Sequence, residues 1–418
     1  MRERGGGYKL PLLLALTLVP TIIKVILLAY DHPIGYTGIG SYYYFVGYET
    51  GFGGRKLLGT LFHYLLPAYS TWSHLRPYII GINLALVALF ILFVARVWRS
   101  GNNKGMLVLL SLYMVSPYSP IGFVYSWMST TSLETWQWVL LLAWILLFLS
   151  APRKWWYYIL TLLIATAGIL IHHTFCCTFL PVMLGLFFYE SFSGGQFQKR
   201  AAIAYGTICF LLLGLFIALW SFSTMNLPQE ELRALIRGRA SSDACIDSEM
   251  LMTFYYYLSS SDNFQQYWIS KPGFYRTKMI ELGLSMILLA PLFITLLWPW
   301  FSAARRENEK ARRRLYYAMG LLPTLLTLPL FFVVADYGRD WTALSFTLLA
   351  VPLAVVARGD KALGASLMRM WDWICRHPIV CLALMVYLLQ LHPSGPHNGY
   401  GPGAGLYEAL ELIKRFLR

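Results

Sequence analysis

The stretch that decides the architecture is DHPIGYTGIGSYYYFVGYETGFGGRKLLG, residues 31–59, which directly follows the first long apolar run of the chain. Its surroundings are almost entirely apolar, yet it holds, among glycines and tyrosines, Asp31, His32, Glu49, Arg55 and Lys56. Charged groups beside a bilayer are costly unless they meet water, one another or a ligand. The stretch therefore predicts one wall of a polar site at a membrane surface, with the rest of the chain as its frame.

The composition indicates that this frame is a membrane protein. Of the 418 residues, 57% are hydrophobic and 13% are charged, whereas a soluble domain carries about 25% charged residues. The 15 Trp and 28 Tyr are typical of aromatic belts at membrane surfaces. We predict an all-α, polytopic helical bundle that forms a single integral-membrane domain over residues 1–418. We expect it in the inner (plasma) membrane of a bacterium.

The apolar runs predict about eleven transmembrane helices of roughly 20 residues, with the N-terminus inside. The net charge of +14 follows from basic loops on the cytoplasmic side, as the positive-inside rule requires, so no nucleic-acid partner is expected. The spans with expected bounds are 10–30, 77–97, 105–125, 156–171, 175–190, 202–222, 279–301, 317–335, 341–357 and 378–391.

Three polar regions fall on the predicted outer face. The first outer loop, 31–76, contains LLGTLFHYLL (57–66), which is apolar but too short to cross and so predicts an interfacial helix. The large outer loop covers 225–277. The outer tail, 392–418, ends in LYEALELIKRFLR, which predicts an amphipathic helix on the membrane surface.

Three acids of this face are candidate catalytic groups: Asp31 after the first span, Glu49 in the first outer loop, and Asp336 at the end of the ninth span. A carboxylate there can act as a general base or bind a divalent cation. The alternative for Asp31 is an ordinary interfacial acid at a helix end. The six Cys show no CxxC or CxxH spacing, so no zinc site is predicted, and no other cofactor is indicated.

Arg55 and Lys56 follow the glycines of GFGGRKLLG at the start of a predicted helix. Backbone N–H groups at a helix start attract anions, and glycines let the backbone approach a ligand closely. We therefore expect a phosphate cradle at these two residues. The alternative is a basic pair that snorkels to the interface.

Three further arginines are candidate phosphate ligands. Arg339 lies between two acids in DYGRDW, where it either faces a phosphate or forms a structural salt bridge. Arg233 and Arg237 are four residues apart and share one helix face. That face could bind pyrophosphate, or it could be a solvated surface with ion pairs to Glu230 and Glu231.

Four residues are candidate substrate contacts: His32 and Tyr337, which follow candidate acids, and His172 and His173, at the tip of a predicted helical hairpin. Neighbouring side chains on a helix point apart. A structural role for the two histidines is therefore the alternative.

The order of these features resembles the GT-C class of integral-membrane glycosyltransferases, which use polyprenyl-phosphate or polyprenyl-pyrophosphate sugars at the extracytoplasmic face. Asp31 matches the essential acid after the first span, and 57–66 matches an interfacial helix of the long first outer loop. The resemblance implies a polyprenyl-linked sugar donor, a glycan or lipid acceptor and contact with membrane lipid. The chain departs from the class at His32, where a second acid is common, and at Asp336, because DYG only partly matches WWDYG.

A second resemblance is to bacterial O-antigen or capsule polymerases of the Wzy type, which carry essential arginines in a large outer loop. Arg233, Arg237 and Arg239 would then bind the pyrophosphate. Two other classes stay open: a flippase or other transporter, and a membrane scaffold without catalytic activity. A transporter is expected to have charges at the membrane midplane and internal repeats, whereas here the polar groups gather on the outer face.

Overall fold

The computed structural model describes residues 42–100, 103–116, 133–192, 197–240, 255–256, 272–328, 331, 337–394 and 399–402. Asp31, His32, Asp336, the first predicted span and the amphipathic end of the tail lie outside the described residues, as do the side chains of Tyr337 and Arg339.

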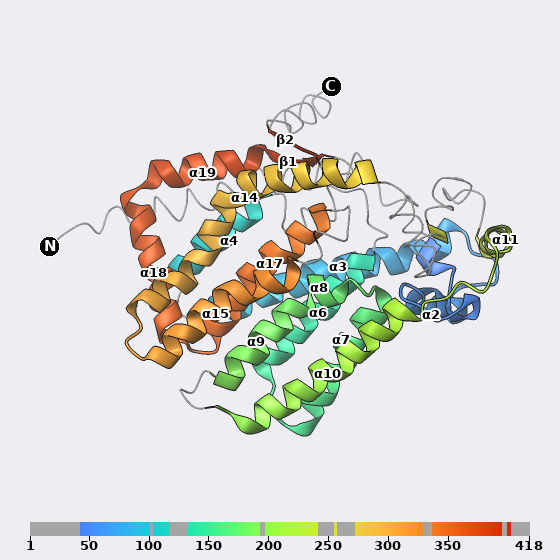
Figure 1. The fold of residues 1–418 in the computed structure, drawn as a ribbon, viewed down its shortest axis with the longest axis horizontal. Helices are drawn as coiled ribbons and strands as arrows, with labels where there is room; N and C mark the ends of the chain where they lie inside the picture. Colours follow the sequence, from blue (N-terminus) through green and yellow to red (C-terminus); the bar gives the residue numbers. More distant parts are fainter. Residues whose placement is uncertain are drawn as a thin grey trace.

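The described chain is predominantly helical (Figure 1). Its elements are the short 3-10 helix η2 (Tyr48–Thr50), α2 (Leu57–Leu65), α3 (Trp72–Trp98), α4 (Asn103–Val115), α6 (Leu133–Ser150), α7 (Trp155–Ile171), α8 (Phe175–Thr178), α9 (Leu180–Phe192), α10 (Lys199–Ser221), α11 (Gln229–Arg239), α14 (Pro272–Arg306), α15 (Lys310–Thr327), α17 (Tyr337–Ala357), α18 (Lys361–Arg376), α19 (Pro378–Gln390), β1 (Leu391–Ser394) and β2 (Gly399–Pro402).

Five helical segments in the described ranges are long and apolar enough to cross a membrane: Ser73–Trp98, Leu133–Ser150, Lys199–Ser221, Leu282–Arg306 and Asp340–Ala357. A sixth is added if α18 and α19, which are bent by 100° at their junction, count as one broken span. Shorter apolar helices are Lys104–Val115, Trp155–Ile171 and Leu180–Phe192. The prediction of a helical membrane protein is thus confirmed, whereas the number of eleven spans and their orientation stay predictions.

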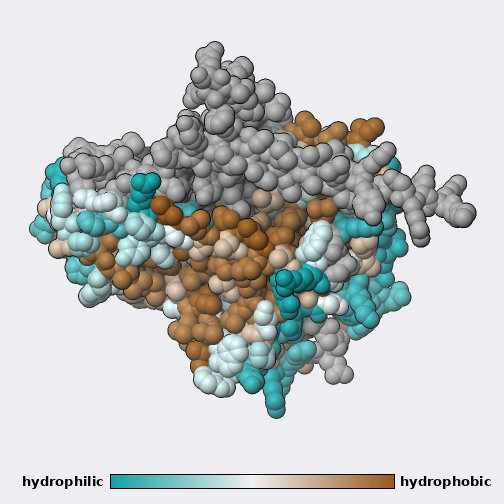
Figure 2. Space-filling view, turned by 180° about the vertical axis from the view of Figure 1, so that it is seen from behind, coloured by the Kyte–Doolittle hydropathy of each residue, from teal (hydrophilic) through white to brown (hydrophobic). Residues whose placement is uncertain are grey.

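Helix α17 occupies the centre of the bundle, and 94% of its apolar window is buried. A helix that is apolar all round is buried by its neighbours, which here include α3, α9, α14 and α15. Phe346 of α17 meets the ring of Trp138 on α6 edge-on at 4.5 Å. Large apolar side chains also cover the outside, such as Phe210 at 75% and Ile287 at 72% exposure. Figure 2 shows hydrophobic side chains over the middle of the described surface and hydrophilic ones at its margins.

One end of the bundle is joined by ion pairs, and we call it the ion-pair end. Glu190 at the end of α9 accepts a 2.6 Å hydrogen bond from Arg153 before α7, and it also binds Tyr205 of α10. Arg358 after α17 approaches Glu190 at 3.6 Å. The basic segments that we expect in the cytoplasm therefore meet at one end of the bundle. The membrane side that this end faces stays a prediction.

Several helix bounds differ from the sequence-based ones. Helix α3 begins at Trp72 rather than at residue 77, because His74 accepts a hydrogen bond from the Thr71 N–H and fixes an earlier start. The helix predicted over 175–190 is interrupted at Phe179, between α8 and α9. The basic segment RRENEKARRR, expected to be a loop, is largely helical, with α14 ending at Arg306 and α15 beginning at Lys310.

The C-terminal part differs as well. The basic segment expected after α17 forms the amphipathic helix α18, whose N-cap Asp360 accepts a hydrogen bond from the Leu363 N–H. Side chains on one face of α18 are buried, among them Leu367 and Ile374. Strands β1 and β2 pair antiparallel, with Leu391 opposite Pro402 and Ser394 opposite Gly399.

Candidate functional site

Two loops predicted for the outer face lie together at the end of the bundle opposite the ion-pair end, where α2 and α11 lie at the right of Figure 1. The Thr224 N–H donates to the Phe52 carbonyl at 2.7 Å, and the Phe52 N–H donates to the Thr224 hydroxyl at 3.2 Å. Further along, the Ser70 N–H donates to the Arg239 carbonyl at 2.8 Å. Phe52 and Thr224 are 172 residues apart in sequence, so two distant segments of the chain form one layer. We call residues 42–71 and 222–240 the loop layer.

The loop layer is held by its own apolar cluster, separate from the core around α17. Phe62 of α2 contacts the ring of Tyr44 at 5.1 Å, and Trp136 of α6 donates to the Tyr44 hydroxyl at 3.1 Å. From α11, Leu232 and Ile236 are fully buried in the same cluster. Burying such side chains favours association by roughly 1.5–3 kcal/mol each, so the loop layer is a packed part of the fold.

Arg55 of the loop layer reaches the turn after α7. Its Nε donates to Nε2 of His172 at 3.0 Å, although the two residues are 117 apart in sequence. Arg55 has φ of 69°, a left-handed conformation that costs a non-glycine residue roughly 1–2 kcal/mol. The approach is close, because a Cβ added to Gly54 would lie 2.8 Å from Nδ1 of His173. The glycine before Arg55 thus lets the two segments meet.

Both ring nitrogens of His172 are engaged in hydrogen bonds. Nε2 accepts from the Arg55 guanidinium. Nδ1 accepts from the Thr174 N–H at 3.2 Å and lies 2.8 Å from the Thr174 hydroxyl. The backbone carbonyl of His172 accepts from the Gln137 amide at 2.8 Å. His172 is therefore fixed from three sides and is only 2% exposed.

His173 lies next to this pair and is partly buried against Trp220 of α10, with ring centroids 5.9 Å apart. Burial, together with the positive charge of Arg55, lowers the pKa of His173 to about 3. The imidazole is therefore neutral at physiological pH. A base this weak is poorly matched to proton abstraction near neutral pH, so His173 can accept or donate a hydrogen bond but does not supply a general base.

Lys56 is 1% exposed, and its amino group does not face a ligand space. It donates to the carbonyls of Gly51 at 3.0 Å and Thr224 at 2.9 Å. Gly51 has φ of 127°, and a Cβ there would meet the Thr224 carbonyl at 2.6 Å, so only glycine fits. This placement favours a structural role for Lys56, which joins the two halves of the loop layer.

Glu49, a candidate base, is engaged by an arginine of the large outer loop. Arg239 pairs with it at 2.6 Å and also donates to the Phe45 carbonyl at 2.8 Å. Partial burial raises the pKa of Glu49, but the hydrogen bonds from Arg239 and from the Gly47 N–H outweigh this and hold the pKa below its usual range. The carboxylate is ionised, and its partners make it a weak base.

Two of the other predicted arginines, Arg233 and Arg237, lie on α11. Arg233 lies 3.6 Å from Glu230 on α11, which is the surface ion pair that the sequence left open as an alternative. Arg237 is exposed in the last turn of α11, and both arginines have further contacts.

Two buried polar residues were not among the predicted site residues. Gln137 is fully buried in α6 and donates to the carbonyls of Gly168 and His172. Asp340, the second acid of DYGRDW, is 3% exposed at the start of α17, which packs on α8. A polar residue early in an apolar run is the signal that could have identified both.

The structure thus brings Arg55, His172 and His173 together, binds Lys56 and Glu49 into the loop layer, and leaves Arg233 on the face of α11. Within the described ranges, no group of three or more His, Cys, Asp or Glu is arranged to hold a metal ion.

Comparisons of the chain with protein-family models, with curated proteins and with solved structures give no match.

Proposed function

We propose that the protein is an integral-membrane glycosyltransferase that moves a sugar or glycan from a polyprenyl-phosphate or polyprenyl-pyrophosphate donor to an acceptor at the extracytoplasmic face. The observation that carries the proposal is the contact between Arg55 and His172, beside His173, under a folded loop layer at one end of an apolar helical bundle. In this proposal the bundle crosses the bacterial inner membrane about eleven times, and the loop layer faces outward.

The chemistry needs a base, an anion site and an entry for lipid. An acceptor hydroxyl loses its proton to a carboxylate, and its oxygen attacks the anomeric carbon. The bond from that carbon to the phosphate oxygen breaks, and the lipid phosphate leaves with the electron pair. Arg55 is placed to stabilise that charge, since guanidinium pairs well with phosphate. The neutral His173 positions a hydroxyl by a hydrogen bond.

The base in this proposal is Asp31 or Asp336. Glu49 is held by Arg239, and His173 has a low pKa, so neither is suited to accept a proton near pH 7. Asp340 is a further carboxylate near α8. A divalent cation bound by these acids would fit the same scheme as a charge stabiliser.

The test uses the full chain in proteoliposomes with polyprenyl-phosphate sugars extracted from the host, and mass spectrometry of the lipid and glycan products. We expect sugar transfer by the natural protein and loss of transfer in Asp31→Asn and Arg55→Gln. Arg99→Gln, at the opposite end of α3 from the loop layer, is the matched control that keeps transfer. Movement of the lipid-linked sugar across the membrane without a new glycosidic bond would overturn the proposal in favour of a flippase.

A further inference from the structure

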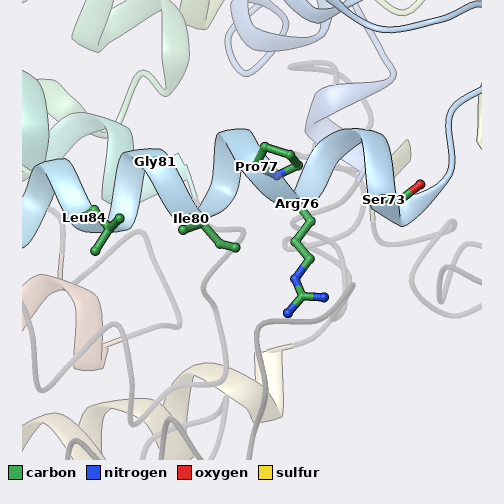
Figure 3. A pocket seen from close by; sticks show the side chains of 6 residues that line it. All are labelled: Ser73, Arg76, Pro77, Ile80, Gly81 and Leu84. Carbon is green, nitrogen blue, oxygen red and sulfur yellow. The ribbon is translucent and has the colours of Figure 1, made fainter.

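A groove on α3 remains outside the site described so far. Its volume is about 680 Å³, which is within the roughly 300–1,000 Å³ range of small-molecule pockets. It is lined by residues of one helix face: Ser73, Arg76, Pro77, Ile80, Gly81 and Leu84. The spacing of three and four residues puts all six on one side of the helix. Figure 3 shows Arg76, Ile80 and Leu84 extending from the same side of α3.

The groove is on the outside of the bundle. The opposite face of α3 carries the buried side chains Leu75, Ile79 and Leu86, which pack in the cores. By contrast, Leu84 is 64% exposed, and Gly81 leaves open space, because an added Cβ would meet nothing within 4 Å. Among the described residues, the part of the groove below Arg76 is therefore lined by the apolar Pro77, Ile80, Gly81 and Leu84.

Arg76 stands at the head of this groove. It is exposed, and among the residues that the structure describes it has no hydrogen-bond or ion-pair partner. Arg96 lies about 20 residues further along α3, roughly 30 Å at ~1.5 Å per residue, and it donates to the Leu149 carbonyl. The hydrocarbon core of a bilayer is about 30 Å thick, so the spacing of the two arginines matches its thickness. In a bilayer-spanning α3, Arg76 lies at headgroup depth at the end that carries the loop layer.

We propose that this groove binds a lipid phosphate, with the phosphate on the Arg76 guanidinium and one long apolar chain along Ile80, Gly81 and Leu84. Three observations support this occupant. The charge of Arg76 is complementary to a phosphate. The groove beneath it is apolar and one helix face wide, which suits one chain. The N-terminus of the 27-residue helix α3 adds partial positive charge at the same depth.

The helix that carries the groove packs on the loop layer with its other faces. Tyr78 of α3, two residues after Arg76, contacts the ring of Phe62 on α2 at 5.1 Å. Leu75 and Ile79 are buried in the same cluster as Tyr44 and Leu58. A lipid held at Arg76 would thus have its headgroup beside the layer that carries Arg55. The inference that this lipid is the sugar donor rests on the proposed function, whereas the groove itself does not.

The test is photolabelling of the full-length protein in phosphatidylcholine nanodiscs, without acceptor. The probe is a photoactivatable farnesyl phosphate, and a photoactivatable farnesol is its neutral counterpart. We expect farnesyl phosphate to label peptides of α3, and Arg76→Gln to reduce this labelling about tenfold, which corresponds to the loss of one charge-assisted hydrogen bond. Arg76→Lys should keep part of the labelling. Farnesol should label weakly and independently of Arg76.

A second variant tests the chain-binding part. Gly81→Leu fills the groove and raises helix propensity, so it should fold normally and lose labelling several-fold. Gly214→Leu on α10 is its matched control, because Gly214 is also exposed with open space around it. Arg99→Gln is the control for Arg76→Gln on the same helix. Both controls should label like the natural protein.

Four results would overturn the proposal that the groove binds a lipid phosphate. Three of them are equal labelling by farnesol, normal labelling of Arg76→Gln, and an equal loss of labelling in Arg99→Gln. The fourth is full displacement of the probe by inorganic phosphate, which would indicate a site for free anions. Labelling that depends on Arg76 in a protein without transferase activity would support the groove and contradict the proposed function. Transfer with an unchanged donor KM in Arg76→Gln would support the proposed function and contradict the inference that the lipid in the groove is the sugar donor.

Discussion

The Arg55 guanidinium donates a 3.0 Å hydrogen bond to Nε2 of His172 across 117 residues of sequence. The pair joins the loop layer to the turn between α7 and α8, at a point where Arg55 has a left-handed backbone with φ of 69°. Such strain persists only where the surrounding contacts determine the conformation. Here Lys56, the next residue, is anchored on two carbonyls and holds the segment in place.

The first prediction separates the backbone of Arg55 from its side chain. Arg55→Ala and Arg55→Gly both remove the guanidinium, so both should lose sugar transfer by about tenfold or more, as expected for one lost charge-assisted contact. Only glycine adopts the left-handed conformation at no steric cost. Arg55→Gly should therefore be more stable than Arg55→Ala by roughly 1 kcal/mol.

The measurements are thermal unfolding in detergent and product formation in proteoliposomes. Arg99→Gln is the control for removing a positive charge from the chain. Equal stability of the two Arg55 variants would contradict the strain at this position. Full activity of either variant would show that Arg55 does not stabilise the phosphate.

The membrane bundle could be predicted because apolar runs of span length are a local signal. The helix at 57–66 was also predicted, and it is α2, Leu57–Leu65. The 100° bend between α18 and α19 could not be predicted in the same way. The bend depends on how α18 packs against α4 and α14. The sequence of a basic amphipathic segment is as consistent with a loop as with a helix.

The site was predictable in part. Sequence identified Arg55, His172 and His173 as polar groups on one face, and the structure brings them together. It could not show that Lys56 donates to the Thr224 carbonyl, 168 residues away, because long-range backbone contacts leave no pattern in the residues that make them. Arg76 was missed for another reason, since a lone arginine near a span end is ordinary until the groove beside it is seen.

The second prediction concerns the pH dependence caused by Lys56. Burial lowers its pKa to about 8 from 10.5, although the Glu49 charge opposes this shift. Between these two pH values the unfolded chain binds the proton more tightly than the folded protein does. The free energy of unfolding should therefore rise with pH between about 8 and 10.5, on the order of 2–3 kcal/mol.

Lys56→Met lacks this titration, so the difference between the natural protein and the variant isolates it. Unfolding by heat in detergent is followed at several pH values for both proteins. The natural protein should gain stability relative to Lys56→Met across that range. A constant difference would mean that the Lys56 amino group is accessible to water in the folded state.

The third prediction is the coupling between Glu49 and Arg239, which are 2.6 Å apart in the loop layer. Glu49 is 38% exposed, so water screens the pair and a double-mutant cycle with Glu49→Gln and Arg239→Gln should give about 0.5–1 kcal/mol. Because the pKa of Glu49 is held low, this stability is present above the usual glutamate pKa and is lost as pH falls through the lowered value.

The control cycle uses Glu230→Gln and Arg233→Gln, a pair 3.6 Å apart within α11, where about 0.3 kcal/mol is expected. Thermal unfolding of the four proteins of each cycle provides both couplings. Equal values for the two pairs would indicate that the Glu49 contact does not hold the loop layer together.

The fourth prediction concerns the ion-pair end, which sequence reasoning treated only as a set of basic loops. The Asp360 carboxylate caps α18 through the Leu363 N–H at 2.9 Å and accepts from the hydroxyls of Tyr189 at 2.7 Å and Tyr316 at 2.9 Å. Asp360→Ala removes a helix cap and leaves the hydroxyls of Tyr189 and Tyr316 without this acceptor. We expect a loss of about 3 kcal/mol in stability, with Tyr189→Phe losing about 1 kcal/mol.

Asp372→Ala is the matched control, because Asp372 is an exposed acid on the same helix and its removal should change stability by no more than about 0.5 kcal/mol. Thermal unfolding of the three variants in detergent measures the effects. Asp360 is at the far end of the bundle from Arg55, so sugar transfer at a temperature where Asp360→Ala stays folded should match the natural protein. A similar loss in Asp360→Ala and Asp372→Ala would show that net charge, rather than the buried contacts, sets the stability of this end.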